Sequence, residues 1–298
     1  MRYAVAHGRR RRGPGGRAAR VGEQAAAALR AAGHDVTEVV PGSLAQARVA
    51  CAALVTDGVD VLVAAGGDGM VSLATDLCAG TSTAVAILPA GTGNDNARSL
   101  GVRRGAHALE VLLADQRRDV DTLHLPDLDR HVLSSVTSAL DARISDRANR
   151  WPRIFGTATY SLSALVEIAL LRRQPPLSYV LTVDGTPLAL EALVVAPANM
   201  PFLGGGLELA PEADPADGLL DLVVITPVTP AEGLGLLRAV RTGRHTGHPA
   251  VSITRARQVR IEGPPDIVAQ GDGEPLAPLP LTVQVSPSIL QVVAPALT

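Results

Sequence analysis

The sequence predicts an α/β domain built on a parallel sheet, joined to a second, mostly antiparallel β-sandwich domain. Over roughly the first 120 residues, short apolar runs alternate with longer Ala-rich amphipathic segments, which is typical of βαβ units. After Asp121 the pattern changes to β-rich runs separated by Gly, Pro and Asp turns, which is typical of a sandwich. We place the boundary in the polar stretch Leu123–Asp129, so the predicted domains are residues 1–125 and 126–298.

Each element of the first domain follows from this alternation. Short apolar runs bounded by polar residues, glycine or proline predict strands at Tyr3–Ala6, Asp35–Val40, Val59–Ala65 and Ala84–Leu88. Longer segments with apolar residues at helical spacing predict helices at Arg17–Ala32, Leu44–Thr56, Val71–Leu77 and Arg104–Ala114.

The second domain is predicted in the same way. Its β-rich runs predict strands at Val132–Val136, Tyr179–Val183, Leu190–Ala196, Leu219–Ile225, Val251–Ile261 and Leu281–Val285. Two longer segments between these runs predict helices at Ile154–Leu171 and Pro230–Arg241.

The basic residues narrow the classes of function. All 27 residues counted as Lys plus Arg are arginine, so mechanisms that need a lysine are excluded, including Schiff-base chemistry and the lysine contacts of P-loops and protein kinases. A formal net charge of −2 gives no overall case for nucleic-acid binding. The dense run Arg9–Arg12 has two interpretations, a solvated surface loop or a segment that faces an anion or a membrane.

The cysteines and the apolar C-terminal run bear on location. Cys51 and Cys78 lie in apolar stretches that read as helices and match no disulfide framework or zinc spacing, which fits a reducing cytoplasm. The charge-free run Pro275–Thr298 is interrupted by prolines that would break a membrane-spanning helix. We therefore expect a cytoplasmic protein that associates with membranes peripherally, if at all.

Two glycine-bearing turns carry the strongest chemical signal. The apolar run Val61–Ala65 leads directly into Gly66-Gly67-Asp68-Gly69, which would present bare backbone amides and a helix N-terminus to a phosphate. A tight structural turn is the alternative interpretation. The next predicted strand leads into Gly91-Thr92-Gly93-Asn94-Asp95, and neighbouring parallel strands deliver such turns to one edge of the sheet.

These two turns, with Leu88-Pro89-Ala90 before the second, resemble the catalytic domain of the diacylglycerol kinase family, which includes sphingosine and bacterial soluble lipid kinases. Gly-Gly-Asp-Gly also occurs in NAD kinases and 6-phosphofructokinases, so the second half of the chain decides. There the resemblance extends to family elements in the expected order: Gly204-Gly205-Gly206, Ala210–Asp214, Asp217–Asp221 and Asp272-Gly273-Glu274.

The resemblance implies an ATP- and Mg²⁺-dependent lipid kinase with a nucleotide-binding first domain and a second domain that holds lipid and metal. It implies catalytic roles for Glu274, as the proton acceptor, and for Asp68. The implied nucleotide contacts are Gly66, Gly67, Asp68, Gly69, Met70, Val71, Ser72, Gly91, Thr92 and Asn94. The implied structural magnesium ligands are Asp214, Asp217 and the carbonyl of Leu219. The expected partner is a lipid at a membrane surface, and a homodimer is left open.

On spacing alone, purely structural interpretations compete with these functional roles. Asp272-Gly273 is a favoured hairpin pair, and Asp214 and Asp217 could be solvated loop acids. Two rival functions therefore stay open beside the lipid kinase: an NAD kinase, and a catalytically inert nucleotide- or lipid-binding member of the same fold. The sequence does not decide which lipid is phosphorylated.

The chain departs from the family pattern at four places. The usual N-P-x-[SG]-G loop after the first strand is replaced by residues 7–16, where we expect arginine to supply the phosphate contact. Met70 replaces a threonine, Ser72 replaces an asparagine, and Ala216 replaces the first acid of a paired D-D-G. Three of these changes touch the nucleotide loops, so weak ATP affinity is the expected defect.

Overall fold

The protein is described by a computed structural model, in which two compact units are resolved by their internal contacts. The first unit consists of Met1–Thr122 together with Ser288–Thr298, and the second consists of Leu123–Pro287. The described residues are 1–9, 16–139, 163, 166–168 and 176–296. The C-terminal segment thus lies in the first unit, whereas the predicted second domain ran to residue 298. The reason is that the chain returns to add a strand to the first sheet.

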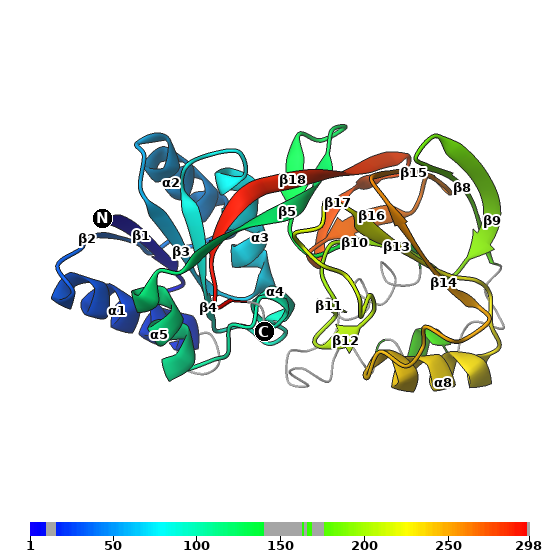
Figure 1. Cartoon of the computed structure of the whole chain (residues 1–298), viewed down its shortest axis with the longest axis horizontal. Helices are drawn as coiled ribbons and strands as arrows, with labels where there is room; N and C mark the ends of the chain where they lie inside the picture. The colour runs from blue at the N-terminus through cyan, green and yellow to red at the C-terminus, as the bar shows by residue number, and fades with distance from the viewer. Residues whose placement is uncertain (10–15, 140–162, 164–165, 169–175, 297–298) are drawn as a thin grey trace. The chain divides into compact units, whose positions relative to one another are not determined.

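The first unit contains a parallel sheet with the strand order β2-β1-β3-β4-β18 (Figure 1). Its strands are β1 (Arg2–His7), β2 (Asp35–Val39), β3 (Val61–Gly66), β4 (Ala84–Pro89) and the end of β18 (Leu281–Val293). Every residue of β3 and β4 is buried, as expected for a parallel sheet that is covered on both faces. Val292 and Val293 of β18 pair in parallel with Val85 and Ala86 of β4.

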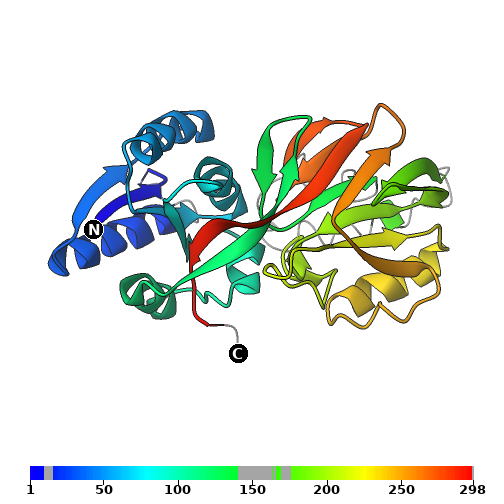
Figure 2. The ribbon, with the colours of Figure 1, turned by 45° about the horizontal axis from the view of Figure 1, so that its top comes forward.

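Helices cover both faces of this sheet (Figures 1 and 2): α1 and α5 lie on one face, and α2 and α3 pack together on the other. The helices are α1 (Gly16–Ala31), α2 (Leu44–Thr56), α3 (Asp68–Cys78), α4 (Asp95–Ser99) and α5 (Ala106–Ala114). The bounds of α2 are as predicted, and the Ser43 side chain caps it by accepting a hydrogen bond from the Gln46 amide at 3.3 Å. The short helix α4 was not predicted.

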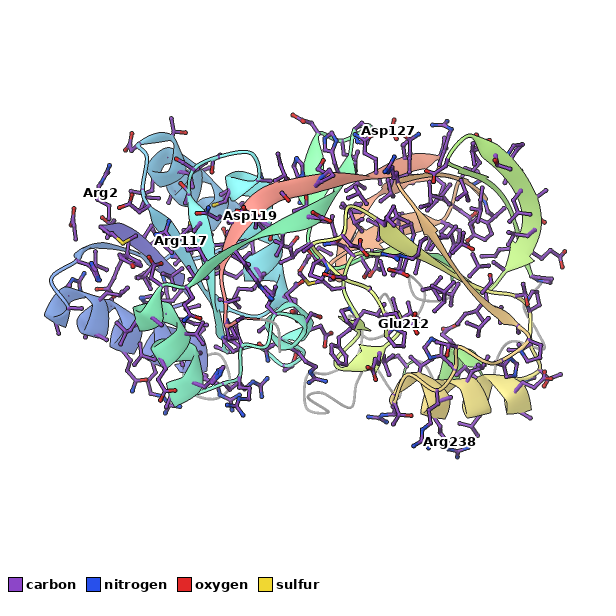
Figure 3. The ribbon with its side chains drawn as sticks, viewed as in Figure 1. Arg2, Arg117, Asp119, Asp127, Glu212 and Arg238 are labelled. Atoms are coloured by element: carbon purple, nitrogen blue, oxygen red, sulfur yellow. The ribbon has the colours of Figure 1, made fainter. Side chains whose placement is uncertain are left out.

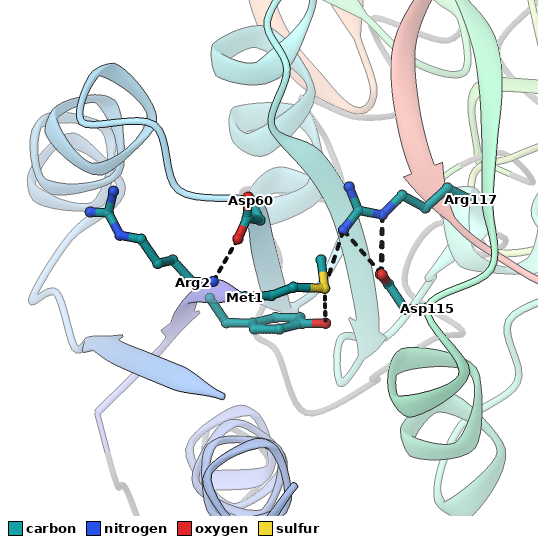
Figure 4. A network of polar contacts seen from close by, with 6 residues as sticks. Met1, Arg2, Asp60, Asp115 and Arg117 are labelled. Carbon is teal, nitrogen blue, oxygen red and sulfur yellow. Dashed lines mark hydrogen bonds and ion pairs between the residues drawn. The ribbon is translucent and has the colours of Figure 1, made fainter. Parts of the chain in front are cut away.

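Contacts at the N-terminus join the start of β1 to the start of β5 (Arg117–Leu125) (Figure 4). The Arg2 amide donates to Asp60 Oδ2 at 2.6 Å. The Tyr3 hydroxyl and the Arg117 guanidinium both contact the Met1 sulfur, at 3.8 and 3.9 Å, and Arg117 also pairs with Asp115 at 3.1 Å. These contacts tie the N-terminus of the chain to Asp60, directly before β3, and to the ion pair of Asp115 and Arg117 at the start of β5.

The second unit is an antiparallel sandwich, as predicted. One sheet has the order β14-β13-β10-β7-β16-β17, and the other brings together β18, β15, β8 and β9. The apolar side chains of both sheets form one buried cluster, which includes Tyr179, Leu181, Leu222, Val259 and Val283. Its strands are β6 (Arg130–Val132), β7 (Val136–Ala139), β8 (Leu177–Val183), β9 (Thr186–Ala192), β10 (Val194–Ala198), β13 (Leu220–Ile225), β14 (Val251–Ala256), β15 (Gln258–Glu262), β16 (Val268–Gly271) and β17 (Glu274–Pro278).

Three runs that we predicted as single strands are each divided in two. Leu190–Ala196 is shared between β9 and β10, and Val251–Ile261 between β14 and β15. In both cases the chain leaves one sheet and enters the other through one residue, Leu193 or Arg257, because strands that switch sheets turn the corner at a bend. The predicted strand Val132–Val136 likewise contains the end of β6 and the start of β7.

The helix α8 (Pro230–Val240) closes a smaller core of the second unit. Leu236 and Val240 pack against this core, whereas Arg238 points outward (Figure 3). Its start is fixed by a capping box between Thr229 and Glu232, with a proline in the first turn. The predicted helix Ile154–Leu171 lies mostly outside the described residues. Within this range the structure describes residues 163 and 166–168, and these are helical. Among the described helices, none has the length and apolar character needed to cross a membrane.

Candidate active site

The two glycine turns meet at the carboxyl ends of β3 and β4. These strands are neighbours, and the Gly66 carbonyl accepts hydrogen bonds from the amides of Ala90 and Gly91, at 2.8 and 3.1 Å. A Cβ atom on Gly91 would lie 2.4 Å from the Cα of Gly67, so no side chain fits between the turns. The expected convergence of the two turns is therefore present, and close approach of the backbones requires glycine at position 91.

Asp68 joins the turns through its carboxylate. Oδ2 accepts a hydrogen bond from the Asn94 amide at 2.8 Å, and Oδ1 accepts one from the Asn96 amide at 3.3 Å. Asn94 is in the left-handed conformation at φ 56°, and its side chain spans the second turn by accepting from the Gly91 amide and donating to the Gly91 carbonyl. Asp68 thus holds the second turn against the first.

The start of α3 offers backbone amides beside the same turns. Gly67 is the N-cap residue and provides no side-chain hydrogen bond, so the positive end of the helix is not capped by a side chain. Met70 is half-buried, whereas Val71 and Ser72 are buried. The glycines and the amides of this helix end, rather than the side chains of Val71 and Ser72, are therefore the groups that can reach a ligand.

The loop after β1 replaces the N-P-x-[SG]-G loop that is usual in the diacylglycerol kinase family. The His7 ring is buried at the end of β1, with Nδ1 3.0 Å from the Gly8 carbonyl and Nε2 3.3 Å from Glu38 Oε2. Hydrogen bonds from Arg30 first, and then from His7, hold the pKa of Glu38 below its usual value. Arg9 is exposed, with its guanidinium beside Gly42 of the loop after β2. Arg10–Arg12 lie outside the described residues.

In the second unit, Asp272-Gly273 forms the hairpin turn between β16 and β17, which agrees with the structural interpretation of this pair. Asp272 is buried in the left-handed conformation, and its carboxylate accepts hydrogen bonds from the Leu133 and Ser134 amides at 3.1 and 2.8 Å. Glu274 is the first residue of β17 and is exposed. Although the residue is exposed, protein atoms around its carboxyl group desolvate it in part, and this effect, followed by the charge of Asp272, raises the pKa of the Glu274 carboxyl. The hairpin thus presents a carboxylate that is a better proton acceptor than an ordinary glutamate.

The expected metal ligands lie in the exposed loop before β13. Oδ1 of Asp214 accepts from the Ala216 amide at 3.0 Å, and Oδ1 of Asp217 accepts from the Leu219 amide at 2.9 Å. The other oxygen of Asp217 pairs with the Arg255 guanidinium. No group of three or more potential ligand side chains gathers anywhere in the described part of the chain. These contacts fit a magnesium ion poorly, because an arginine already occupies the Asp217 carboxylate.

Two residues that contact the glycine turns lie outside the sequence motifs. Asn96 is buried and its amide contacts Asp68, and Arg104 donates hydrogen bonds to the carbonyls of Gly91 and Thr92. The absence of lysine was the only sequence signal that could have pointed to Arg104, since any cationic side chain near these turns must be an arginine or a histidine.

The motif Gly204-Gly205-Gly206 forms the turn between β11 (Phe202–Leu203) and β12 (Leu207–Glu208).

Comparisons with known proteins identify the families that this chain resembles. Residues 11–125 match the family model of the diacylglycerol kinase catalytic domain, and residues 134–294 match that of the YegS C-terminal NAD kinase beta sandwich-like domain. A diacylglycerol kinase of Mycobacterium tuberculosis is 35% identical over 94% of this chain and 91% of the relative. A probable lipid kinase YegS-like of Pseudomonas aeruginosa is 28% identical over 91% of this chain and 89% of the relative.

Solved structures share the fold. One from Bacillus anthracis has a TM-score of 0.80 at 20% identity and covers 99% of this chain and 95% of that chain. Another, of a diacylglycerol kinase from the same organism, has a TM-score of 0.72 at 18% identity and covers 98% of this chain and 96% of that chain. With the two family models and the Mycobacterium relative, the conclusion is that this chain belongs to the diacylglycerol kinase family of lipid kinases.

Proposed function

We propose that the protein transfers the γ-phosphoryl group of ATP, bound as its magnesium complex, to a hydroxyl group of a diacylglycerol-like or sphingosine-like lipid at a membrane surface. The proposal rests above all on the contact between the turns at Gly67 and Gly91, with Asp68 bonded to the Asn94 amide. Such a pair of bare backbone turns at the end of a parallel sheet suits a polyphosphate.

The first unit supplies the groups that bind and orient the nucleotide. Amides of the two turns and of the α3 N-terminus donate hydrogen bonds to phosphate oxygens, and arginine replaces the lysine that other kinases use. Within the basic run Arg9–Arg12, the structure describes Arg9, which lies in the loop after β1, the strand that pairs with β3. Since phosphoryl transfer has a loose transition state, positioning and neutralisation of charge are the main tasks of these groups.

The second unit supplies the proton acceptor. As the lipid oxygen forms its bond to the γ-phosphorus and the bond to the ADP oxygen breaks, the Glu274 carboxylate takes the proton of the lipid hydroxyl. The raised pKa of Glu274 favours this role, because a base that is too weak would not hold the proton. We assign Mg²⁺ to the nucleotide, where it neutralises phosphate charge. Asp214, Asp217 and Leu219 have no part in this transfer, since Arg255 already pairs with the Asp217 carboxylate.

A direct phosphorylation assay tests the proposal. Purified protein is incubated with γ-labelled ATP and Mg²⁺ and is offered diacylglycerol in micelles, sphingosine, phosphatidylglycerol or NAD in turn. Label in a lipid extract supports the lipid kinase. Label on NAD would reassign the protein as an NAD kinase, and measurable ATP binding without any labelled product would identify an inert member of the fold.

A matched pair of variants connects the assay to the site. Glu274→Gln removes the proton acceptor while keeping the shape of the side chain, so kcat should fall about 100-fold or more with nearly unchanged ATP affinity. Glu262→Gln makes the same change at an exposed residue of β15 and should leave kcat unchanged. Normal turnover of Glu274→Gln would remove Glu274 from the mechanism.

A further inference from the structure

The guanidinium of Arg104 contacts the second glycine turn from outside the motif. Arg104 lies in the loop between α4 and α5, and its Nη2 donates hydrogen bonds to the carbonyls of Gly91 and Thr92, the latter at 3.2 Å. We propose that Arg104 is a positioning residue that aims the amides of Thr92 and Gly93 at the phosphates of a nucleoside triphosphate. This inference rests on the proposed function and adds a residue to the binding of its nucleotide.

The direction of these amides follows from peptide geometry. In a trans peptide the N–H points opposite to the C=O of the preceding residue. Because Arg104 draws the carbonyls of Gly91 and Thr92 toward itself, the amides of Thr92 and Gly93 point away from it. Neither amide has an acceptor within the described part of the chain, so both are available to an anion.

The polar groups of Gly91 and Asn94 in this turn are already engaged. The Gly91 amide donates to Asn94 Oδ1 at 2.8 Å, and the Gly91 carbonyl also accepts from Asn94 Nδ2 at 3.1 Å. The Asn94 amide donates to Asp68. Arg104 is the donor that holds the Thr92 carbonyl, so without it the outer half of the turn keeps little restraint. A turn that samples several conformations binds an anion less tightly than one that is already oriented.

The neighbouring residue provides a matched control. Arg103 is also exposed and carries the same charge, and its side chain makes no hydrogen bond or ion pair with the described residues. Alanine at either position therefore removes one positive charge near the turn, but only alanine at position 104 removes the two hydrogen bonds to its carbonyls. A purely electrostatic attraction of the nucleotide would respond to both substitutions alike.

The experiment compares Arg104→Ala, Arg104→Lys and Arg103→Ala with the wild-type protein. For Arg104→Ala we expect the Kd and the KM for MgATP to rise about tenfold, with kcat changed less than about threefold. Arg104→Lys keeps a cationic donor group without the planar guanidinium and should recover part of the affinity, and Arg103→Ala should stay within about twofold of wild type. Hydrogen exchange of the free protein should be faster in Arg104→Ala at the amides of Gly91, Asn94 and Asn96, which are the hydrogen-bonded amides of the turn.

Each outcome decides between roles. Equal effects of Arg103→Ala and Arg104→Ala on affinity would overturn the positioning role. So would weaker ATP binding in Arg104→Ala with unchanged hydrogen exchange at the turn, since Arg104 would then contact phosphate directly. If the wild-type protein binds no ATP, the proposed function fails, while the exchange measurement still decides whether Arg104 orders the turn: faster exchange supports it and unchanged exchange refutes it.

Discussion

Asp272 and Ser134, which are 138 positions apart in the sequence, share two hydrogen bonds: the Ser134 amide and hydroxyl donate to Asp272 Oδ1 at 2.8 and 2.6 Å. In the other direction, the Asp272 amide donates to the Ser135 carbonyl at 3.1 Å. The hairpin that carries Glu274 is therefore held by its first turn residue to the chain between β6 and β7. The position of the proposed proton acceptor depends on this buried carboxylate.

Removal of the Asp272 carboxylate should destabilise the protein. Asp272→Ala leaves two buried backbone amides and a hydroxyl without their acceptor, so the free energy of unfolding should fall by about 3 kcal/mol. Ser134→Ala removes only one of these bonds and should cost about 1 kcal/mol. Urea denaturation of the three proteins measures both losses. Equal stability of Asp272→Ala and wild type would show that the carboxylate does not hold the hairpin.

Glu274 should make stability depend on pH. Its pKa in the folded protein is raised above the ordinary 4.5, so the folded state binds the proton more tightly than the unfolded state does. The resulting stability is fully present below the ordinary pKa and is lost as pH rises through the raised folded pKa. Glu274→Gln should thus be more stable than wild type at about pH 7, and the difference should vanish at about pH 4.

Denaturation midpoints at the two pH values check this, with Glu110→Gln on the exposed face of α5 as the matched control. Comparison with this variant separates an effect at position 274 from the general effect of removing one glutamate. A Glu274→Gln protein that is less stable than wild type at neutral pH would contradict the raised pKa.

Asp68 should be needed for order in the second turn. Asp68→Ala leaves the amides of Asn94 and Asn96 without their carboxylate acceptor, so we expect a loss of about 1–3 kcal/mol in unfolding free energy and weaker MgATP binding. Asp57→Ala, at an exposed helix end, should change neither. Calorimetric titration with MgATP and urea denaturation measure the two effects. Wild-type affinity in Asp68→Ala would separate this carboxylate from nucleotide binding.

Arg255 should take the place of a metal at Asp217. Because the guanidinium pairs with the Asp217 carboxylate, millimolar Mg²⁺ should not raise the Tm of the wild-type protein. Arg255→Met frees the carboxylate, so its Tm should be lower and should rise on addition of Mg²⁺. The double variant Arg255→Met/Asp217→Ala is the control and should not respond. A wild-type Tm that rises with Mg²⁺ and no longer does so in Asp217→Ala would show that a metal binds despite the arginine.

The two free cysteines should be unreactive in the folded protein. Burial raises the pKa of Cys51 to about 11 and that of Cys78 to about 12, so almost no thiolate is present near neutral pH. A chromogenic disulfide reagent at about pH 8 should therefore react slowly with the thiols of the native protein and rapidly with those of the denatured protein. Fast reaction of one thiol per native chain would mean that α2 or α3 opens readily.

The sequence by itself determined the features that depend on neighbouring residues. The bounds of α2, the order of strands and helices in the first 90 or so residues, and the two glycine turns follow from local periodicity and turn chemistry. The placement of Cys51 and Cys78 in helices was predicted for the same reason. The helix α3 begins at Asp68, after the N-cap residue Gly67, three residues before the predicted start at Val71. The apolar pattern missed this first turn because its residues are not part of the apolar repeat.

Only the tertiary structure decided which sheet each strand joins and which distant groups meet. An unbroken apolar run such as Val251–Ile261 looks the same whether it stays in one sheet or crosses to another at Arg257. The return of β18 to the first unit, the bond of Asp272 to Ser134 and the contact of Arg104 with Gly91 join residues far apart along the chain. Such contacts form because the packed fold brings the groups together. Local sequence patterns do not show which residues, far apart along the chain, will lie close in space.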